Sequence, residues 1–245
     1  MFVLKKADPP LRRRTVDKHS VEFIERVPCG SEIASFRFAR PDGYDFVAGQ
    51  HLILGVQTAD GPERKPFTHS SAPDDGYLEI TTRLSGSAFK NALLGLAPGD
   101  LVEVSGPTGR LMLPPDTRRV RFLVGGVGIT PARSMLRDAV YTDRSWDDAV
   151  LFYGNRDSSC IPFIDEFEAM RGRGVRIVSV VEHPDDAWTG PVGFITADLV
   201  REHVDPAEGI YLASGPPVMV AAMERVMDDL GIPDERRRIE RFGPA

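Results

Sequence analysis

The sequence predicts a two-domain protein, in which an antiparallel β-barrel is followed by an α/β domain with a doubly wound, five-stranded parallel sheet. Before Pro114, short apolar runs alternate with turn residues, which is typical of an antiparallel barrel. After Pro115, apolar strands alternate with stretches of helical periodicity, which indicates parallel strands joined by crossover helices. We therefore expect the domains at residues 1–116 and 117–245.

Five runs rich in Val, Ile and Phe are the predicted strands of the first domain, at residues 20–27, 33–38, 51–56, 78–83 and 101–104. Turns containing Gly and Asp separate them, at residues 41–43, 59–61, 74–76 and 98–100. Residues 87–96 have the apolar spacing of a helix. Residues 1–19 are expected to form a loose arm, in which the arginines at 12–14 are a solvated run.

The second domain is expected to have strands at residues 120–124, 149–153, 176–181, 209–213 and 238–241. Helices are expected between them at residues 131–141, 163–171, 196–203 and 216–230. The last helix has the clearest pattern, and Gly231 follows as its expected C-terminal residue. Its apolar residues at helical spacing are Val220, Met223, Val226, Met227 and Leu230.

The composition narrows the class of protein. The net charge is −6, from 30 Lys and Arg against 36 Asp and Glu, which gives no electrostatic case for nucleic acid as a partner. No apolar run approaches the roughly 18 residues of a membrane span, and the N-terminus does not resemble a signal peptide. Two cysteines, Cys29 and Cys160, are too few for a four-cysteine metal or iron–sulfur site. We expect a cytoplasmic protein without a metal.

A glycine-rich run, GGVGITP at 125–131, directly follows the first strand of the second domain. Glycines at Gly126 and Gly128 allow a tight turn and close approach to a ligand. Thr130 is expected to cap the following helix, with Pro131 as its first residue. Such a helix start favours an anion such as the diphosphate of a dinucleotide. The alternative is a glycine-rich turn that binds nothing, since the third glycine of the common fingerprint is absent.

Two further loops follow strands of the same predicted sheet. Gly215 and Pro216 lie in the run SGPPVM at 214–219, and ligands of such sheets bind outside the carboxyl ends of the strands. The second predicted strand ends near Arg156 and Asp157. A cation such as Arg156 favours a ribose 2′-phosphate, whereas an acid such as Asp157 favours a free 2′-hydroxyl. Arg156 is nearer the strand end, which favours NADPH over NADH; the alternative is a surface ion pair.

Together these motifs resemble the ferredoxin–NADP reductase superfamily over residues 20–242. In the first half, RKPFT at 64–68 resembles the superfamily's flavin signature Arg-x-(Tyr/Phe/Leu)-(Ser/Thr), and Gly49-Gln50 resembles its upstream Gly-Gln. The resemblance implies an FAD-binding barrel and an NAD(P)-binding α/β domain. It implies a flavin site that includes the signature residues Arg64, Lys65, Pro66, Phe67 and Thr68.

This sequence departs from the signature at two positions. Lys65 stands where the superfamily has the arginine that holds the flavin phosphates, with Arg64 one position earlier. Lysine keeps the charge and loses the bidentate fork, so either residue is a candidate ligand. Phe67 replaces the more frequent tyrosine and lacks its hydroxyl. The second flavin-phosphate element would be the start of the first helix, with Ser87, Ala88 and Phe89. Lys90 is less favoured there, and the alternative is a capped surface helix.

The resemblance also implies the reaction. A hydride would pass from NAD(P)H to FAD, with Thr68 beside flavin N5 and Ser214 bordering the nicotinamide in the place of a frequent cysteine. Glu240 would supply protons or polarise the region of Ser214, and Phe242 would cover the flavin. The alternatives are a strand-end charge for Glu240 and core packing for Phe242. His69 is expected to be a half-buried filler.

The electron acceptor is expected to be a separate protein such as a ferredoxin, a flavodoxin or an oxygenase component, because this chain has no iron–sulfur domain. A basic docking patch would support this, with candidates Arg64, Lys65, Arg83 and Lys90. The alternatives are a free-flavin or ferric reductase, a degenerate member acting as a binding or regulatory scaffold, and a dinucleotide-binding domain without flavin.

Overall fold

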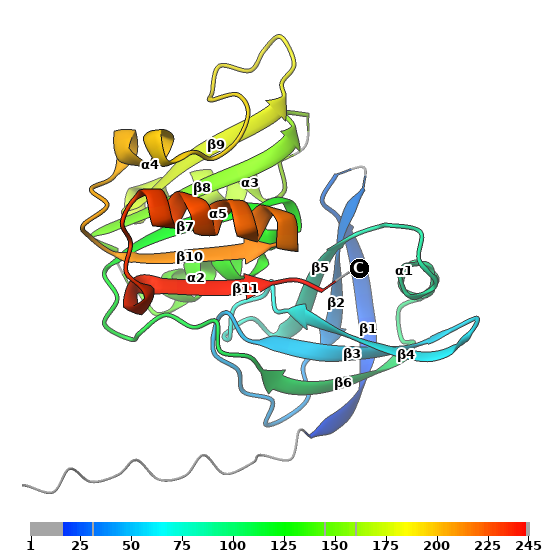
Figure 1. Ribbon diagram of the computed structural model, residues 1–245. Helices are drawn as coiled ribbons and strands as arrows, with labels where there is room; N and C mark the ends of the chain where they lie inside the picture. Colours follow the sequence, from blue (N-terminus) through cyan, green and yellow to red (C-terminus); the bar gives the residue numbers. More distant parts are fainter. Residues whose placement is uncertain (1–16, 31, 145, 160, 244–245) are drawn as a thin grey trace, which may run out of the picture.

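The computed structural model describes residues 17–30, 32–144, 146–159 and 161–243. The arginines predicted to be solvated, at 12–14, lie outside the described residues. Two β-sheets lie next to each other, and each has its own hydrophobic core (Figure 1). In the part of the chain that the structure describes, no helix is long and apolar enough to cross a membrane.

The first sheet is antiparallel and has six strands in the order β4-β3-β6-β1-β2-β5. Its strands are β1 (Lys18–Pro28), β2 (Ile33–Ala39), β3 (His51–Thr58), β4 (Gly61–Thr68), β5 (Tyr77–Arg83) and β6 (Leu101–Thr108). A bridge between His69 and Ile80 links the two outer strands, so the sheet closes into the predicted barrel. Phe36 and Leu54 are among the side chains that fill its interior. Helix α1 (Ala88–Leu94) packs against β3.

Strand β4 is the barrel element that the sequence analysis missed. Two prolines, Pro62 and Pro66, and several charged residues hide its pattern. β4 lies at the edge of the sheet order, where proline is tolerated because one side of the strand needs no ladder hydrogen bonds. The prediction of a loose arm up to residue 19 is wrong for Lys18 and His19, which belong to β1 and pair with β6.

The second sheet contains five parallel strands in the order β11-β10-β7-β8-β9. The strands are β7 (Arg119–Gly125), β8 (Asp148–Asp157), β9 (Val175–His183), β10 (Ile210–Gly215) and β11 (Arg237–Arg241). The helices are α2 (Thr130–Tyr141), α3 (Ile164–Glu168), α4 (Ala197–His203) and α5 (Pro217–Asp229). α2 and α3 cover one face and α4 and α5 the other (Figure 1). The predicted doubly wound sheet is confirmed.

Two helix starts differ from the prediction. Phe163 has a φ of +62°, in the left-handed region, so it cannot belong to the helix expected at 163–171; α3 has only 5 residues. Thr130 does not cap α2. Residues 126–129 already form a 3₁₀ turn, and the Thr130 hydroxyl donates to the Val127 carbonyl at 3.2 Å. A capping residue needs extended backbone, which the chain has left before Thr130.

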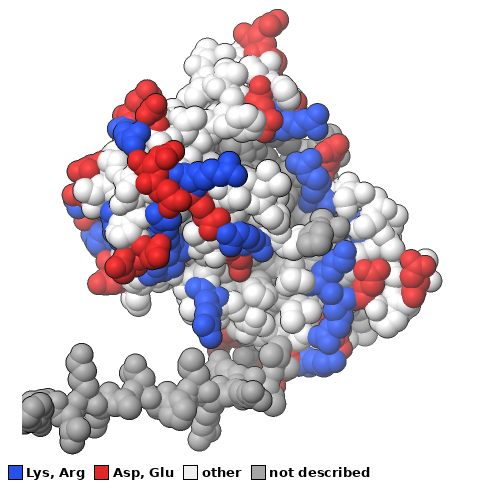
Figure 2. Space-filling model, viewed as in Figure 1, with Lys and Arg blue, Asp and Glu red and all other residues white. Residues whose placement is uncertain are grey.

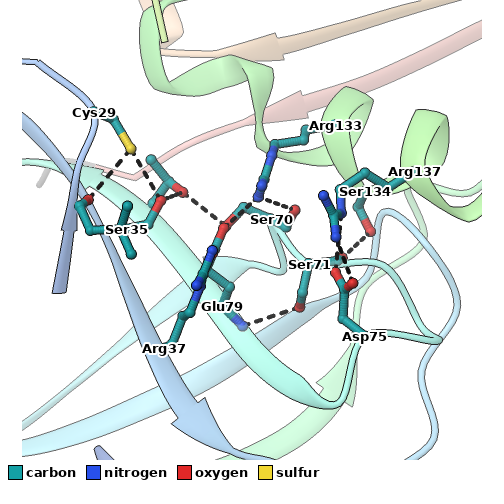
Figure 3. Close-up of polar contacts among 12 residues, drawn as sticks. Cys29, Ser35, Arg37, Ser70, Ser71, Asp75, Glu79, Arg133, Ser134 and Arg137 are labelled. Atoms are coloured by element: carbon teal, nitrogen blue, oxygen red, sulfur yellow. Dashed lines mark hydrogen bonds and ion pairs between the residues drawn. The ribbon is translucent and has the colours of Figure 1, made fainter. Parts of the chain in front are cut away.

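A buried polar network holds α2 against the barrel (Figure 3). The Arg133 guanidinium pairs with the Glu79 carboxylate and donates to the Ser70 carbonyl at 2.8 Å. Arg133 and Glu79 are only 4% and 1% exposed. One turn further along α2, Arg137 binds the Asp75 carboxylate through two hydrogen bonds of 2.6 and 3.1 Å. Because α2 follows the glycine-rich loop, this network fixes the position of that loop relative to the barrel.

Candidate active site

The glycine-rich loop after β7 and the end of β10 are in direct contact. A Cβ atom at Gly128 would lie 2.1 Å from the Ser214 carbonyl oxygen, so only glycine fits there. The Ser214 hydroxyl is buried and donates to the Gly128 carbonyl at 2.7 Å. Gly215 follows with a φ of +144°, and Pro216 precedes α5. The prediction that these two loops converge at one edge of the sheet is confirmed.

A cavity of about 150 Å³ lies between the barrel and the second sheet, beside this glycine loop. Gly126 and Arg156 line it from the second sheet, and Arg83 and Glu32 line it from the barrel. Arg83 pairs with Glu32 at 3.2 Å, and a Cβ at Gly126 would lie 3.9 Å from the Arg83 guanidinium. The cavity therefore combines a glycine turn with Arg83, which is paired with Glu32, and with Arg156, which is next to Asp157; the two guanidinium groups suit a phosphate-bearing ligand.

The flavin signature lies on β4, where successive side chains point to opposite sides. Arg64 points to β6, where it pairs with Glu103 at 2.9 Å and donates to the Ser105 hydroxyl. Lys65 points toward α1, with its ammonium 5.4 Å from the centre of the Phe89 ring. Phe67 lies on the same side of β4 as Lys65, and its ring packs against Phe89 at 5.7 Å.

Helix α1 faces these two signature residues. Ser87 caps it as predicted, because its hydroxyl accepts from the Lys90 backbone N–H at 3.4 Å. Lys90 was a candidate for the docking patch, and that prediction is wrong: Lys90 is 1% exposed. Its ammonium donates to the Thr82 hydroxyl at 2.5 Å and lies 4.4 Å from the centre of the Phe67 ring.

Thr68, the last signature residue, contacts the other domain. Its hydroxyl donates to Glu240 on β11 at 3.2 Å, across 172 positions of sequence. The second Glu240 oxygen is 3.7 Å from His51 Nδ1, and His51 Nε2 is 3.0 Å from the Thr108 hydroxyl. These four side chains form a polar chain with a hydrogen bond at each end and a longer contact, of 3.7 Å, between Glu240 and His51. His51 directly follows Gly49-Gln50 in the sequence, but no motif indicated it as a functional residue.

The end of β11 lies beside the glycine loops. Ser214 pairs with Glu240 in the parallel register, and the Phe242 N–H donates to the Gly215 carbonyl at 2.9 Å. The Ser214 hydroxyl is bonded to Gly128 and the Glu240 carboxylate to Thr68, so the two functional groups do not meet. Phe242 is half-buried at this position.

His69 is fully buried, not half-buried as expected. Its ring stacks on Phe46 at 3.9 Å and is hydrogen-bonded to the Tyr44 hydroxyl at 3.2 Å and the Gln50 carbonyl at 2.8 Å. Burial lowers the pKa of His69 to about 3. The imidazole is therefore neutral at physiological pH and belongs to the barrel framework.

The comparisons with known proteins agree with this architecture. Residues 20–113 match the family model of the oxidoreductase FAD-binding domain, and residues 122–225 match that of the oxidoreductase NAD-binding domain. The chain is 30% identical over 226 residues to an NADH-cytochrome b5 reductase 1 of Aspergillus terreus, covering 84% of this chain and 76% of that one. The chain belongs to the ferredoxin–NADP reductase superfamily.

Other members of the superfamily align over most of their length. A human NADH-cytochrome b5 reductase 1 is 26% identical over 259 residues, covering 90% of this chain and 85% of that one. The structure of an Amycolatopsis cytochrome P450 reductase superposes with a TM-score of 0.82, at 26% identity, over 95% of this chain and 72% of that one. A Neisseria gonorrhoeae ferredoxin NADP+ reductase shares the fold, with a TM-score of 0.80 at 21% identity.

The residues present fit the two cofactors of this superfamily. The barrel side offers the buried ammonium of Lys90 and the half-buried one of Lys65 for the diphosphate of FAD. The other side offers a glycine cradle at Gly128 that any side chain would fill. The protein is an FAD-containing NAD(P)H reductase.

Proposed function

We propose that this reductase takes a hydride from NADPH or NADH into its FAD and passes electrons to a separate haem protein of the cytochrome b5 type. One observation carries the first half of this proposal. The hydrogen bond from Thr68 to Glu240 joins the flavin signature to the strand beside the glycine loops. A flavin held by the barrel and a nicotinamide held by the second sheet would therefore meet at this contact.

Each cofactor has its own set of proposed ligands. FAD would be held by β4 and the start of α1, through Lys65, Pro66, Phe67, Thr68, Ser87, Ala88 and Phe89. Arg64 is a weaker candidate, since its guanidinium is engaged with Glu103. The nicotinamide nucleotide would lie along the glycine loops and the cavity, in contact with Gly126, Gly128, Thr130, Arg156, Gly215 and Pro216.

Bound FAD supplies the redox chemistry, by accepting a hydride and releasing electrons to the acceptor. The protein orients the rings and handles protons. The Thr68 hydroxyl would hydrogen-bond flavin N5, and Glu240, His51 and Thr108 would carry the N5 proton away through the polar chain. Ser214, with its hydroxyl bonded to Gly128, would shape the nicotinamide site, and Phe242 would cover the flavin ring until the nicotinamide displaces it.

The relatives named above support a haem protein as the acceptor, since they are NADH-cytochrome b5 reductases. Charge supports an acidic partner: Lys and Arg side chains run down the barrel half of the face seen in Figure 2. Two of the barrel's cations, Lys18 and Arg64, contact the same carboxylate, that of Glu103, at 3.4 and 2.9 Å. Such a surface accelerates docking of an acidic protein.

Anaerobic stopped-flow reduction tests both halves of the proposal. The flavin should bleach with NADPH or NADH, and the reduced protein should then reduce cytochrome b5 at a rate that falls as salt rises. If neither nucleotide bleaches the flavin, the hydride step is refuted. If the flavin bleaches but a ferredoxin, a flavodoxin, an oxygenase component, free FMN or a ferric chelate is reduced faster than cytochrome b5, the acceptor is wrong.

A further inference from the structure

Lys90 is a buried cation without an acidic partner in the part of the chain that the structure describes. The residue is 1% exposed, and its ammonium contacts the Thr82 hydroxyl and the face of Phe67. The charged group that faces it is another cation, Lys65 on β4. Both ammonium groups lie within 6 Å of the centre of the Phe89 ring, at 5.7 Å for Lys90 and 5.4 Å for Lys65.

This arrangement is unfavourable for the protein by itself. Removing an ammonium from water is strongly unfavourable unless an anion compensates its charge, and the hydroxyl and aromatic contacts offset only part of that free energy. Burial, with a smaller contribution from Lys65, lowers the pKa of Lys90 to about 8. An apolar residue such as methionine would fill this position at lower cost, so the charge points to an anion that arrives from outside.

The position of the pair identifies the anion. Lys65 occupies the place of the signature arginine, and Phe67 is the aromatic residue of the same signature. Both lie on the side of β4 that faces Lys90. We propose that Lys90 binds the diphosphate of FAD and that Lys65 and Lys90 together replace the single bidentate arginine of the superfamily pattern. This inference rests on FAD binding and adds a ligand that the signature does not contain.

Two properties follow. Lys90 should discriminate flavins by their phosphates, because riboflavin has no phosphate and FAD has two. FAD affinity should also depend on pH. The diphosphate binds the protonated amine, and in the free protein Lys90 loses its proton as the pH rises through about 8. Affinity for FAD should therefore fall as the pH rises through about 8, while affinity for riboflavin stays level.

The test uses the full-length apoprotein and quenching of flavin fluorescence. Lys90→Met should raise the Kd for FAD by about tenfold or more, as expected for one charge-assisted hydrogen bond, and change that for riboflavin less than twofold. The melting temperature of the apoprotein should stay the same or rise, because a buried uncompensated charge is removed. Arg171→Met, which removes an exposed cation paired with Glu168, is the control and should change none of these quantities.

Each other outcome is decisive. If the wild-type apoprotein takes up no FAD, the proposed function itself fails. If Lys90→Met binds FAD as the wild type does, the proposal for Lys90 is refuted while the function stands. If Lys90→Met binds FAD and riboflavin with equally reduced affinity and its melting temperature drops, Lys90 has a structural role and the proposal is again wrong. If Lys90→Met does not fold, Lys90→Arg is the deciding variant. Arginine stays protonated between pH 8 and 9.5, so this variant should not lose FAD affinity over that range; a loss equal to that of the wild type would refute the proposal.

Discussion

Thr68 places one hydroxyl at the border of the two domains. It is 7% exposed, and its oxygen is 3.2 Å from the Glu240 carboxylate. A buried hydroxyl that already donates to a carboxylate can still accept a hydrogen bond through a lone pair. In the site that we propose, the Thr68 oxygen would therefore accept a hydrogen bond from a flavin nitrogen while its hydroxyl donates to the Glu240 carboxylate.

We predict that Thr68→Val slows flavin reduction about tenfold, which corresponds to about 1.4 kcal/mol of lost transition-state stabilisation. Valine keeps the shape and removes the hydroxyl, so the Kd for FAD should change less than threefold. Stopped-flow reduction and flavin titration measure the two effects. Thr142→Val, which removes an exposed hydroxyl at the end of α2, is the matched control. An unchanged reduction rate in Thr68→Val would contradict the role at N5.

Arg156 is the residue that we propose distinguishes NADPH from NADH. It is exposed at the cavity beside Gly126, next to Asp157. We predict that Arg156→Ala raises KM for NADPH about tenfold, the effect of one charge-assisted contact to a 2′-phosphate, and leaves KM for NADH within twofold. Arg171→Ala, which breaks an exposed pair with Glu168, is the control for loss of an arginine. Equal effects on both nucleotides would remove the argument for NADPH.

Among the helices and strands, α2 both continues the glycine loop and binds the barrel. Its first residue follows the glycine loop, and its side chains bind the barrel through Arg133, Ser134 and Arg137 (Figure 3). These contacts are polar, and Arg133 and Ser134 are buried. Buried ion pairs add little net stability, but removal of one partner leaves a charge without compensation. The docking of the two domains should therefore be sensitive to single changes in this network.

We predict that Arg133→Met lowers the free energy of unfolding by about 3 kcal/mol, because the buried Glu79 loses one of its two arginines. The double variant Glu79→Gln with Arg133→Met should recover part of this loss, since neither charge remains. Urea denaturation of each variant gives the values. Arg176→Met, which breaks an exposed pair with Asp148, should cost at most about 1 kcal/mol. Equal losses for Arg133→Met and Arg176→Met would refute the argument.

At the scale of the whole molecule, the barrel closes through buried polar residues. His69 bridges to Ile80 between the outer strands, and its ring lies against Phe46 and Tyr44. Burial holds the pKa of His69 near 3, below its ordinary value of 6.5. The unfolded chain therefore binds a proton below pH 6.5 that the folded barrel does not bind. The stability of the fold should fall as the pH falls through this range.

We predict that His69 lowers the free energy of unfolding of the wild type by about 2 kcal/mol when the pH falls from 7 to 5. This value follows because pH 5 lies about 1.5 pH units below the ordinary pKa of 6.5, which applies to the unfolded chain. His69→Gln should be less stable at pH 7 but should lose less stability on acidification. His183→Gln, at an exposed site, should follow the wild-type slope. Urea denaturation at pH 7, 6 and 5 measures the slopes, and identical slopes for wild type and His69→Gln would show that His69 is not the source.

The order of the elements could be predicted from the sequence because it depends on local patterns. Apolar runs identified five of the six barrel strands, and the alternation after Pro115 identified the parallel sheet. The pattern failed at β4, where edge position permits prolines, and at Phe163, where the backbone turns left-handed. Both failures occur where the surroundings, and not the residue types, decide the conformation.

The two kinds of sheet, the glycine loops and the signature could be recognised from the chain alone, because they depend on residue type and spacing. The folded structure was needed to show that Lys65 faces α1 and its neighbour Arg64 faces β6, because successive side chains of a strand point in opposite directions. It also decided that Lys90 is buried and that His51 joins Thr68 and Glu240. These contacts join residues from different strands or different domains, and no local pattern in the chain records which distant side chains will meet.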